Sequence, residues 1–243
     1  MSAKRDGKIA LIMSVFMLFG LQVLFAASPA RALDREIEGA LSRYFDNVPV
    51  RVEVKAPGEV VLKGGVTSLA DEHSIYEIAS RVKGVKKLTM DIQVRPSMPM
   101  TDEQIKIQIV NGLKINSQIL VPDNITVNVL DGNVTLAGKA QSVKEVEAAE
   151  KVALFQMGVK GLESNIQVLS NRSHPLADQD VLGLVNGVIE DHFPLVKDKV
   201  KASVSGGHVV LNGMVTTIWE KDNLPREVKR VMGVKDVENH LAL

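Results

Sequence analysis

Hydrophobic and polar positions follow one another in this chain in an order that occurs three times. A stretch with an apolar residue at every fourth position, typical of one face of a helix, comes first. Two short stretches with alternating apolar and polar residues follow, as in strands with one buried face. A second helical stretch and a third alternating stretch complete each copy. The core stripes of the three opening helices are Ile37, Leu41 and Phe45; Ile105, Ile109 and Leu113; Val181, Val185 and Ile189.

The repeat is clearest in a block that aligns three times without a gap, at residues 58–94, 132–168 and 207–243. Each copy opens with Gly-x-Val-x-Leu-x-Gly, has Gly-Val-Lys further on, and closes on an alternating strand. Solenoid units repeat about every 20 to 50 residues. The copies in this chain are further apart than that, so each copy is predicted to be a small domain.

Local signals predict the turns between these elements. Asp131-Gly132 and Gly206-Gly207 tolerate the positive φ angles of tight hairpins, whereas Ala56-Pro57-Gly58 predicts a looser hairpin in the first copy. The second helix makes a crossover, so the strands that it joins should run parallel. The predicted fold class is α+β, with three tandem αββαβ domains, each a three-stranded mixed sheet covered on one face by two helices. In each copy a hydroxyl residue caps the second helix and an acid follows three residues later; the caps are Ser68, Ser142 and Thr217.

One departure from the repeat falls in the third copy. Pro225 lies about eight positions into the predicted second helix. An interior proline lacks the N–H of the helical ladder and costs on the order of 3 kcal/mol. This helix is therefore expected to kink, or to begin late near Asp222, and the third copy is expected to deviate most from the fold.

The N-terminal segment has the pattern of a secretory signal peptide. Three basic residues precede an apolar run at 9–27, and Ala30-Arg31-Ala32 has the small-x-small form of a cleavage site. The alternative is an uncleaved inner-membrane anchor through residues 9–27, because the run approaches the length of a bilayer span. The predicted segments are the signal peptide at 1–32 and domains at 33–96, 100–169 and 175–243.

The charge balance argues against one class of partner, and the absence of cysteine excludes several kinds of covalent or metal site. The chain has 29 basic and 29 acidic residues, and residues 1–32 hold four of the bases and one of the acids, which leaves a formal charge of −3. A nucleic-acid partner needs a basic face and is not expected. With no cysteine, the chain has no disulfide, no thiolate metal site and no lipidated cysteine.

No catalytic constellation is visible in the sequence. The five histidines fall in different columns of the repeat, and neither a His-Glu-x-x-His motif nor a phosphate-binding loop occurs. The shared columns hold Gly, Val and Leu, which build turns and cores. The sequence therefore predicts a non-enzymatic binding module with no cofactor and no metal.

Trp219 is the only tryptophan and the first candidate for a contact residue. Its neighbour Ile218 takes the inward position, so the indole should point away from its own domain core. One interpretation is packing against a linker or a neighbouring domain. The other is an anchor in a membrane or a partner, because tryptophan favours boundaries between water and apolar surroundings.

The second candidate is the opening helix of the second domain, where Ile107 and Val110 lie off the core stripe, with Lys106 and Lys114 beside them. One interpretation is burial against another domain. The other is an apolar patch flanked by bases, suited to a shallow contact with anionic lipid or a partner. On the second interpretation, serine at both apolar positions should weaken binding to anionic vesicles and leave thermal stability nearly unchanged.

These columns resemble the BON domain family over about residues 33–243. The resemblance depends on the Asp-x-x-Ile/Val start of the first helix, the Gly-x-Val-x-Leu-x-Gly strand, the Gly-Val element and the closing strand. It implies the αββαβ fold and a periplasmic protein of the osmotic or envelope-stress type. It also implies binding to phospholipid surfaces or envelope proteins without enzymatic activity. The alternative function is a periplasmic protein-binding or chaperone-like module that receives partner segments at outward side chains and open sheet edges.

Overall fold

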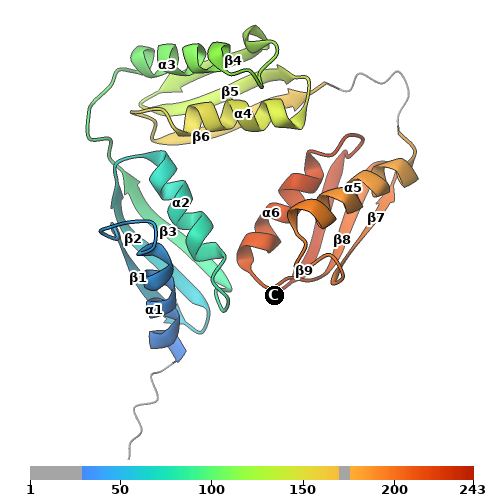
Figure 1. Cartoon of the computed structure of the whole chain (residues 1–243), viewed down its shortest axis with the longest axis horizontal. Helices are drawn as coiled ribbons and strands as arrows, with labels where there is room; N and C mark the ends of the chain where they lie inside the picture. Colours follow the sequence, from blue (N-terminus) through green and yellow to red (C-terminus); the bar gives the residue numbers. More distant parts are fainter. Residues whose placement is uncertain (1–28, 170–175) are drawn as a thin grey trace, which may run out of the picture.

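The computed structural model describes residues 29–169 and 176–243, so the predicted signal peptide lies almost wholly outside the described residues, as does the apolar run at 9–27. The described chain forms three domains of the predicted element order (Figure 1). Domain 1 contains α1 (Pro29–Leu41), β1 (Val50–Ala56), β2 (Glu59–Val66), α2 (Leu69–Ser80) and β3 (Lys87–Val94). Domain 2 contains α3 (Asp102–Ile115), the short 3-10 helix η1 (Pro122–Asn124), β4 (Ile125–Leu130), β5 (Asn133–Ala140), α4 (Val143–Leu154) and β6 (Gly161–Val168). Domain 3 contains α5 (Asp178–His192), β7 (Val200–Ser205), β8 (His208–Met214), α6 (Ile218–Lys229) and β9 (Asp236–Ala242).

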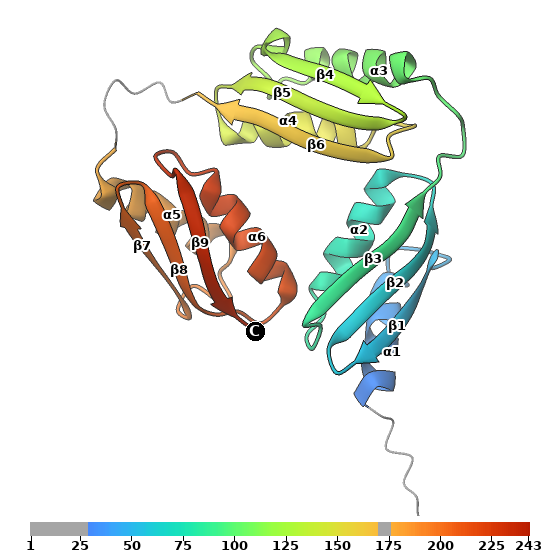
Figure 2. The same cartoon turned by 180° about the vertical axis from the view of Figure 1, so that it is seen from behind.

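Each domain has one three-stranded sheet with its second strand in the middle. The middle strand pairs antiparallel with the first strand and parallel with the third. Figure 2 shows the sheets from behind, with the two helices of each domain on one face. The predicted fold class is confirmed. The predicted looser hairpin of domain 1 is also confirmed, since the β1–β2 register shifts between Val54 and Ala56.

The predicted stripes form the cores. Ile105, Ile109 and Leu113 of α3 are at most 1% exposed, and they pack with the inward residues of β4, β5 and α4. The corresponding stripes of α1 and α5 are buried in the same way, except that Phe45 lies beyond α1 and is half-buried against its core. Burial of a large aliphatic side chain contributes about 1.5–3 kcal/mol, so each small domain has a core of its own.

Two glycine columns of the repeat allow close backbone contacts. A Cβ atom on Gly138 would lie 2.0 Å from the carbonyl oxygen of Asn124, and one on Gly213 would lie 2.0 Å from that of Lys199. The glycines of the hairpin turns also lie close to a backbone carbonyl. A Cβ atom on Gly132 would lie 3.0 Å from the carbonyl oxygen of Gly158. In domains 2 and 3 the two glycines of the pattern Gly-x-Val-x-Leu-x-Gly are therefore explained by close backbone contacts together with positive φ angles.

The aspartate that opens the first helix of the repeat holds the hairpin turn. In domain 2, Asp102 accepts hydrogen bonds from the backbone N–H groups of Asp131 (2.8 Å) and Gly132 (2.9 Å). In domain 3, Asp178 does the same for Gly206 and Gly207. We call this arrangement the aspartate clamp.

Domain 1 lacks the clamp because Pro57 occupies the first turn position and has no N–H to donate. Its aspartate, Asp34, accepts only from the backbone of Arg35 among the hydrogen bonds of the described residues. The expectation that Asp34 begins the helix was wrong. Helix α1 begins at Pro29 and has no acid in its first turn.

The expectation of a late start for α6 was also wrong. Thr217 caps this helix with a complete capping box, and the helix continues through Pro225 to Lys229. The missing N–H of Pro225 leaves the carbonyl of Lys221 without its helical donor. The side chain of Asn239 on β9 donates to this carbonyl at 3.2 Å, so domain 3 keeps the common fold.

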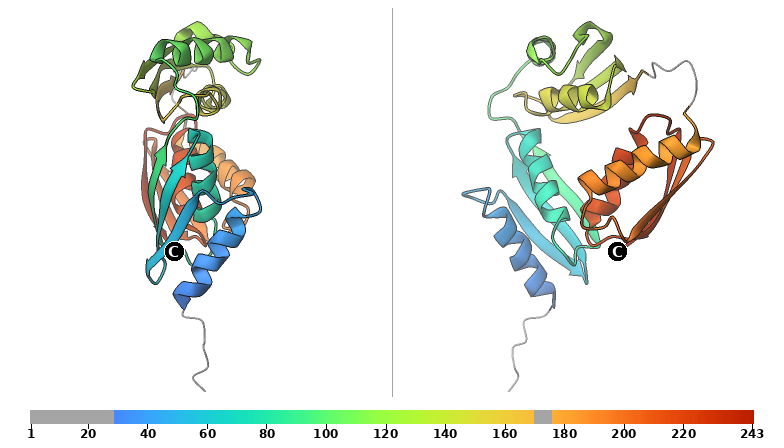
Figure 3. Two further views of the ribbon diagram at one scale, coloured as in Figure 1. Left: turned by 90° about the vertical axis from the view of Figure 1, so that its left-hand side faces the viewer. Right: turned by 45° about the vertical axis from the view of Figure 1, so that its right-hand side comes forward.

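The three domains form a triangle with the second helices, α2, α4 and α6, on its inner side (Figure 1). The side view in Figure 3 shows that the arrangement is one domain thick. Helix α3 lies on the outer side of domain 2. None of the helices in the described ranges is long and apolar enough to cross a bilayer.

Candidate functional site

Domain 3 contacts domain 1 through helix α6 and domain 2 through Arg230, the residue that follows this helix. Trp219 makes the contact with domain 1: its Nε1 donates to Glu77 Oε2 at 2.7 Å, and the guanidinium carbon of Arg81 lies 3.6 Å from the ring centroid. The indole also packs on the buried ring of Phe193, with centroids 5.4 Å apart. Trp219 therefore lies between its own core and α2, as the first interpretation of this residue predicts.

A second bond between the same helices joins Tyr76 to Asp222. The tyrosine hydroxyl donates to Asp222 Oδ2 at 2.8 Å. Burial, together with this bond, raises the pKa of Tyr76. The phenol is therefore a fixed hydrogen-bond donor rather than an acid in this contact.

Arg230, which follows α6, connects domain 3 to domain 2. Its guanidinium lies 2.9 Å from Glu150 Oε2 and 3.5 Å from Glu147 Oε1, both on α4, and 3.4 Å from Glu227 Oε1. Burial raises the pKa of Glu227, and His192 lies 3.9 Å from that carboxylate. The sequence analysis did not identify this arginine as a contact residue.

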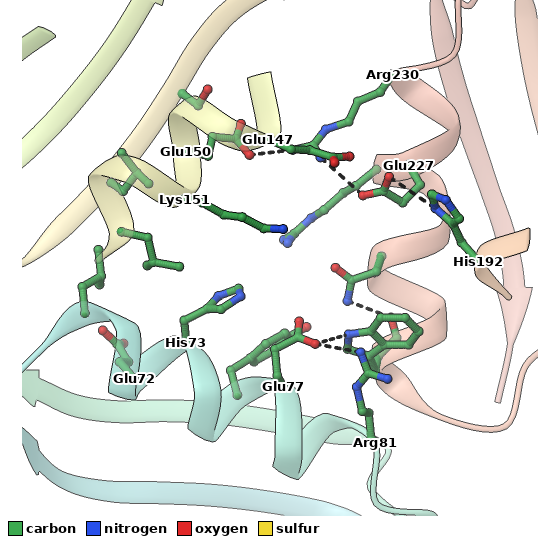
Figure 4. A pocket seen from close by; sticks show the side chains of 18 of the residues that line it. Glu72, His73, Glu77, Arg81, Glu147, Glu150, Lys151, His192, Glu227 and Arg230 are labelled. Carbon is green, nitrogen blue, oxygen red and sulfur yellow. Dashed lines mark hydrogen bonds and ion pairs between the residues drawn. The ribbon is translucent and has the colours of Figure 1, made fainter. Parts of the chain in front are cut away.

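These contacts surround a cavity of approximately 1010 Å³ to which all three domains contribute side chains (Figure 4). Glu72, His73 and Glu77 enter it from α2, and Lys151 enters it from α4. Apolar walls come from Leu69, Met90, Leu154 and Leu162. Within the described residues no cluster of three or more histidine, aspartate or glutamate side chains is suited to a metal ion.

The outward face of α3 brings together three of its four predicted contact residues. Lys106, Ile107 and Lys114 are all exposed, and the side chain of Ile107 is 51% exposed. Burial of Ile107 against another domain is therefore wrong. Val110 differs, because it is half-buried and packs against the core of domain 2. The expectation that its substitution by serine leaves stability unchanged does not fit this packing.

The structure adds two apolar residues to this surface that the sequence analysis did not identify. Ile115 ends α3 and is 84% exposed, and Leu120 in the following loop is 72% exposed. Ile115 lies two positions beyond the last core residue, Leu113, and this spacing was the only available signal. We call Lys106, Ile107, Lys114, Ile115 and Leu120 the α3 surface.

A buried carboxylate fixes the loop of the α3 surface. Glu145 is 1% exposed, and its Oε1 accepts from the backbone N–H groups of Leu120 (2.9 Å) and Val121 (3.3 Å). Its Oε2 accepts from the backbone of Gln141 at 2.6 Å. Glu145 occupies the acidic position that follows the cap Ser142 by three residues. In domain 2 this acid also holds the backbone of Leu120 in place, although the side chain of Leu120 faces solvent.

The BON domain family matches this chain three times, at residues 30–96, 101–170 and 178–243. The chain therefore belongs to the BON domain family, as the sequence resemblance predicted, and each of its domains is a BON domain.

Two similar solved structures are periplasmic or secretion-system proteins. One is the C-terminal domain of CdsD, the structural protein of the type III secretion system of Chlamydia trachomatis, at 17% identity and a TM-score of 0.24, covering 87% of this chain and 96% of that chain. The other is the PrgH periplasmic domain, at 11% identity and a TM-score of 0.20, covering 80% of this chain and 94% of that chain. Neither TM-score supports a shared domain arrangement or a shared activity. A search of curated proteins finds no match.

Proposed function

We propose that this protein is a non-enzymatic binding protein of the periplasm, and that domain 2 contacts anionic phospholipid surfaces through the α3 surface. Membership in the BON family supports an envelope-associated module. The observation that carries the lipid contact is the exposed Ile107 beside Lys106 and Lys114, on a helix that faces away from the other domains (Figure 1).

The composition of the α3 surface suits a shallow and reversible contact. An aliphatic side chain that leaves water contributes about 1.5–3 kcal/mol when burial is complete. Each base near an anionic membrane adds about 1 kcal/mol. Two acids lie in the first turn of α3: Asp102 is engaged in the aspartate clamp, whereas Glu103 is exposed one helical turn before Ile107 and opposes an anionic surface.

Flotation with anionic vesicles at low salt tests this proposal. Ile107→Ser and Lys114→Gln are expected to reduce co-flotation severalfold without a change in melting temperature, because both side chains are exposed and surface substitutions change stability by within about 0.5 kcal/mol. Leu184→Ser on α5 is the matched control, since Leu184 is 47% exposed on the corresponding helix of domain 3. Unchanged flotation of the Ile107 and Lys114 variants would refute the α3 surface as the lipid contact.

The chaperone-like alternative uses the same assay with a second readout. Each sheet has two edge strands, the first and the third, and an edge strand can pair with an extended partner segment. If the protein does not float with vesicles but photocrosslinkers at Ile107 or Leu120 capture envelope proteins, the α3 surface is a protein-binding site.

A further inference from the structure

Helix α3 carries a second stripe of side chains, in addition to the stripe that faces the core of domain 2. Glu103, Ile107, Val110 and Lys114 follow one another at spacings of four, three and four positions. Residues three or four positions apart lie on the same side of a helix, so these side chains form one row. All of them are exposed except Val110, which is half-buried. We call this row the outer stripe of α3.

The outer stripe lies on a side of α3 that no other element covers. The neighbouring helix α4 packs against a different side, since a Cβ atom on Gly112 would lie 2.6 Å from Cγ1 of Val152. Domains 1 and 3 lie on the far side of α4 from this helix (Figure 1). Within the part of the chain that the structure describes, neither Glu103 nor Lys114 uses its side chain in an ion pair or hydrogen bond. The charges at both ends of the outer stripe are therefore available to a partner.

The apolar pair of the outer stripe is particular to domain 2. In the first helices of the other two domains the corresponding positions hold a glycine and a small polar residue: Gly39 and Ser42, and Gly183 and Asn186. All three domains have the same fold, so that fold does not require an isoleucine at position 107. The isoleucine has to be explained by a contact that domains 1 and 3 do not make.

The order of side chains along the outer stripe is complementary to itself. It has an acid at its N-terminal end, a base at its C-terminal end and two apolar residues between them. If two such helices pack antiparallel about a two-fold axis, Glu103 of each copy faces Lys114 of the other, and Ile107 faces Val110. A parallel arrangement would instead place like charges opposite each other. Spacings of three and four positions are those of the seam between two paired helices, and a two-fold contact needs a self-complementary surface.

We propose that two copies of this protein associate through the outer stripes of α3, packed antiparallel. A contact through one helix of each copy belongs to the small and transient class of interfaces, so the dimer should form and separate with concentration. The dimer covers Ile107, which the proposed lipid contact also needs. Dimer formation and membrane contact therefore exclude each other. This inference rests on the same exposed helix as the proposed function but does not require lipid binding.

Sedimentation equilibrium over a range of protein concentrations tests this proposal with charge reversals. The parent protein should show a monomer–dimer equilibrium. Glu103→Lys alone and Lys114→Glu alone each give the stripe like charges at both ends, and each should weaken the dimer at least about tenfold. The double variant should associate as the parent does, because its charges are exchanged but still complementary. An equimolar mixture of the two single variants should form a mixed dimer for the same reason.

Lys139→Glu is the matched control, because Lys139 is an exposed base on β5 of the same domain but not on α3. Its dimer should be as strong as that of the parent. A parent protein that stays monomeric at all soluble concentrations, or a dimer that the single reversals do not weaken, would overturn the proposal. Failure of both the double variant and the mixture to associate would overturn the antiparallel arrangement. Vesicle flotation separates this dimer from the lipid contact, since Glu103→Lys should weaken the dimer but strengthen binding to anionic vesicles.

Discussion

Arg230 is predicted to hold domain 3 against domain 2, and its removal should open the triangle. In Arg230→Gln the carboxylates of Glu147, Glu150 and Glu227 lose the guanidinium that lies 2.9–3.5 Å from them. Three neighbouring carboxylates without a cation repel one another. The substitution therefore removes an attraction between the two domains and introduces a repulsion.

The magnitude follows from the exposure of these groups. The side chain of Arg230 is 29% exposed and the three glutamates are 23–34% exposed, so solvent screens each pair in part. Exposed pairs contribute about 0.2–1 kcal/mol each. Only the pairs with Glu147 and Glu150 cross between the domains, since Glu227 and Arg230 both belong to domain 3, and these two pairs together with the new repulsion amount to about 1–2 kcal/mol. The equilibrium between closed and open domain arrangements should shift about 5-fold to 30-fold.

The absence of cysteine from the chain makes the assay specific. Spin labels at Asn128→Cys on β4 and Lys201→Cys on β7, both exposed, report the distance between domains 2 and 3. The parent protein should give a narrow distance distribution and Arg230→Gln a broader one with longer distances. High salt should broaden the parent distribution as well, because the Debye length falls from about 10 Å at 0.1 M to about 3 Å at 1 M.

Lys229→Gln is the matched control, because this neighbouring side chain is exposed and its ammonium group bonds the backbone of Lys235 within domain 3. If Arg230→Gln gives the same distances as the parent protein at low salt, the ion pairs do not hold the domains together. Equal broadening by Lys229→Gln would also refute the reasoning, since that effect would be one of net charge.

Three further predictions concern individual contacts. Asp102→Ala should destabilise domain 2 by about 2 kcal/mol, because two backbone N–H groups lose a charged acceptor. Asp34→Ala should destabilise domain 1 by less than about 1 kcal/mol. Native-state hydrogen exchange measures the stability of each domain separately and so tests both values. Burial raises the pKa of Glu227 above its ordinary value of 4.5, so its ionised form disfavours folding once the pH exceeds that value. Glu227→Gln should therefore melt no lower than the parent at pH 7, with any gain lost below pH 4.5, and a clear loss of stability at pH 7 would contradict this sign. Asn239→Ala should lower the free energy of unfolding of the parent protein by about 0.5–1.5 kcal/mol. In a protein that already carries Pro225→Ala it should have almost no effect, because the new N–H of Ala at position 225 donates to the Lys221 carbonyl. Denaturant melts of the parent, the two single variants and the double variant measure this coupling.

The fold was accessible from the sequence because its signals are local. Apolar spacing, the caps at Ser142 and Thr217, and the turn glycines each act within a few residues, and threefold repetition removed most ambiguity. The errors were local as well. The start of α1 was placed too late because the helix continues upstream of Asp34, and Pro225 was judged without the donor that Asn239 supplies from another strand.

The contacts between domains could not be predicted from the sequence in this way. Trp219 and Glu77 are 142 residues apart, and Arg230 and Glu150 are 80 residues apart. No periodicity relates residues at such separations, and their columns differ from one copy of the repeat to the next. An angular position on a helix also does not give burial, which is why Ile107 and Val110 looked equivalent in the sequence but differ in exposure.

The missing aspartate clamp of domain 1 has a consequence for how this sequence can change over generations. In domains 2 and 3 the aspartate accepts from the backbone N–H of the first turn residue, so a proline at that turn position would break the clamp while the aspartate remains. Pro57 has already broken that link in domain 1, and Asp34 is released from it. In a library of single substitutions scored for folded protein, Asp34 should accept many residues, whereas Asp102 and Asp178 should accept few. The aspartate position would then vary more in domain 1 than in domains 2 and 3, although all three domains keep the same fold.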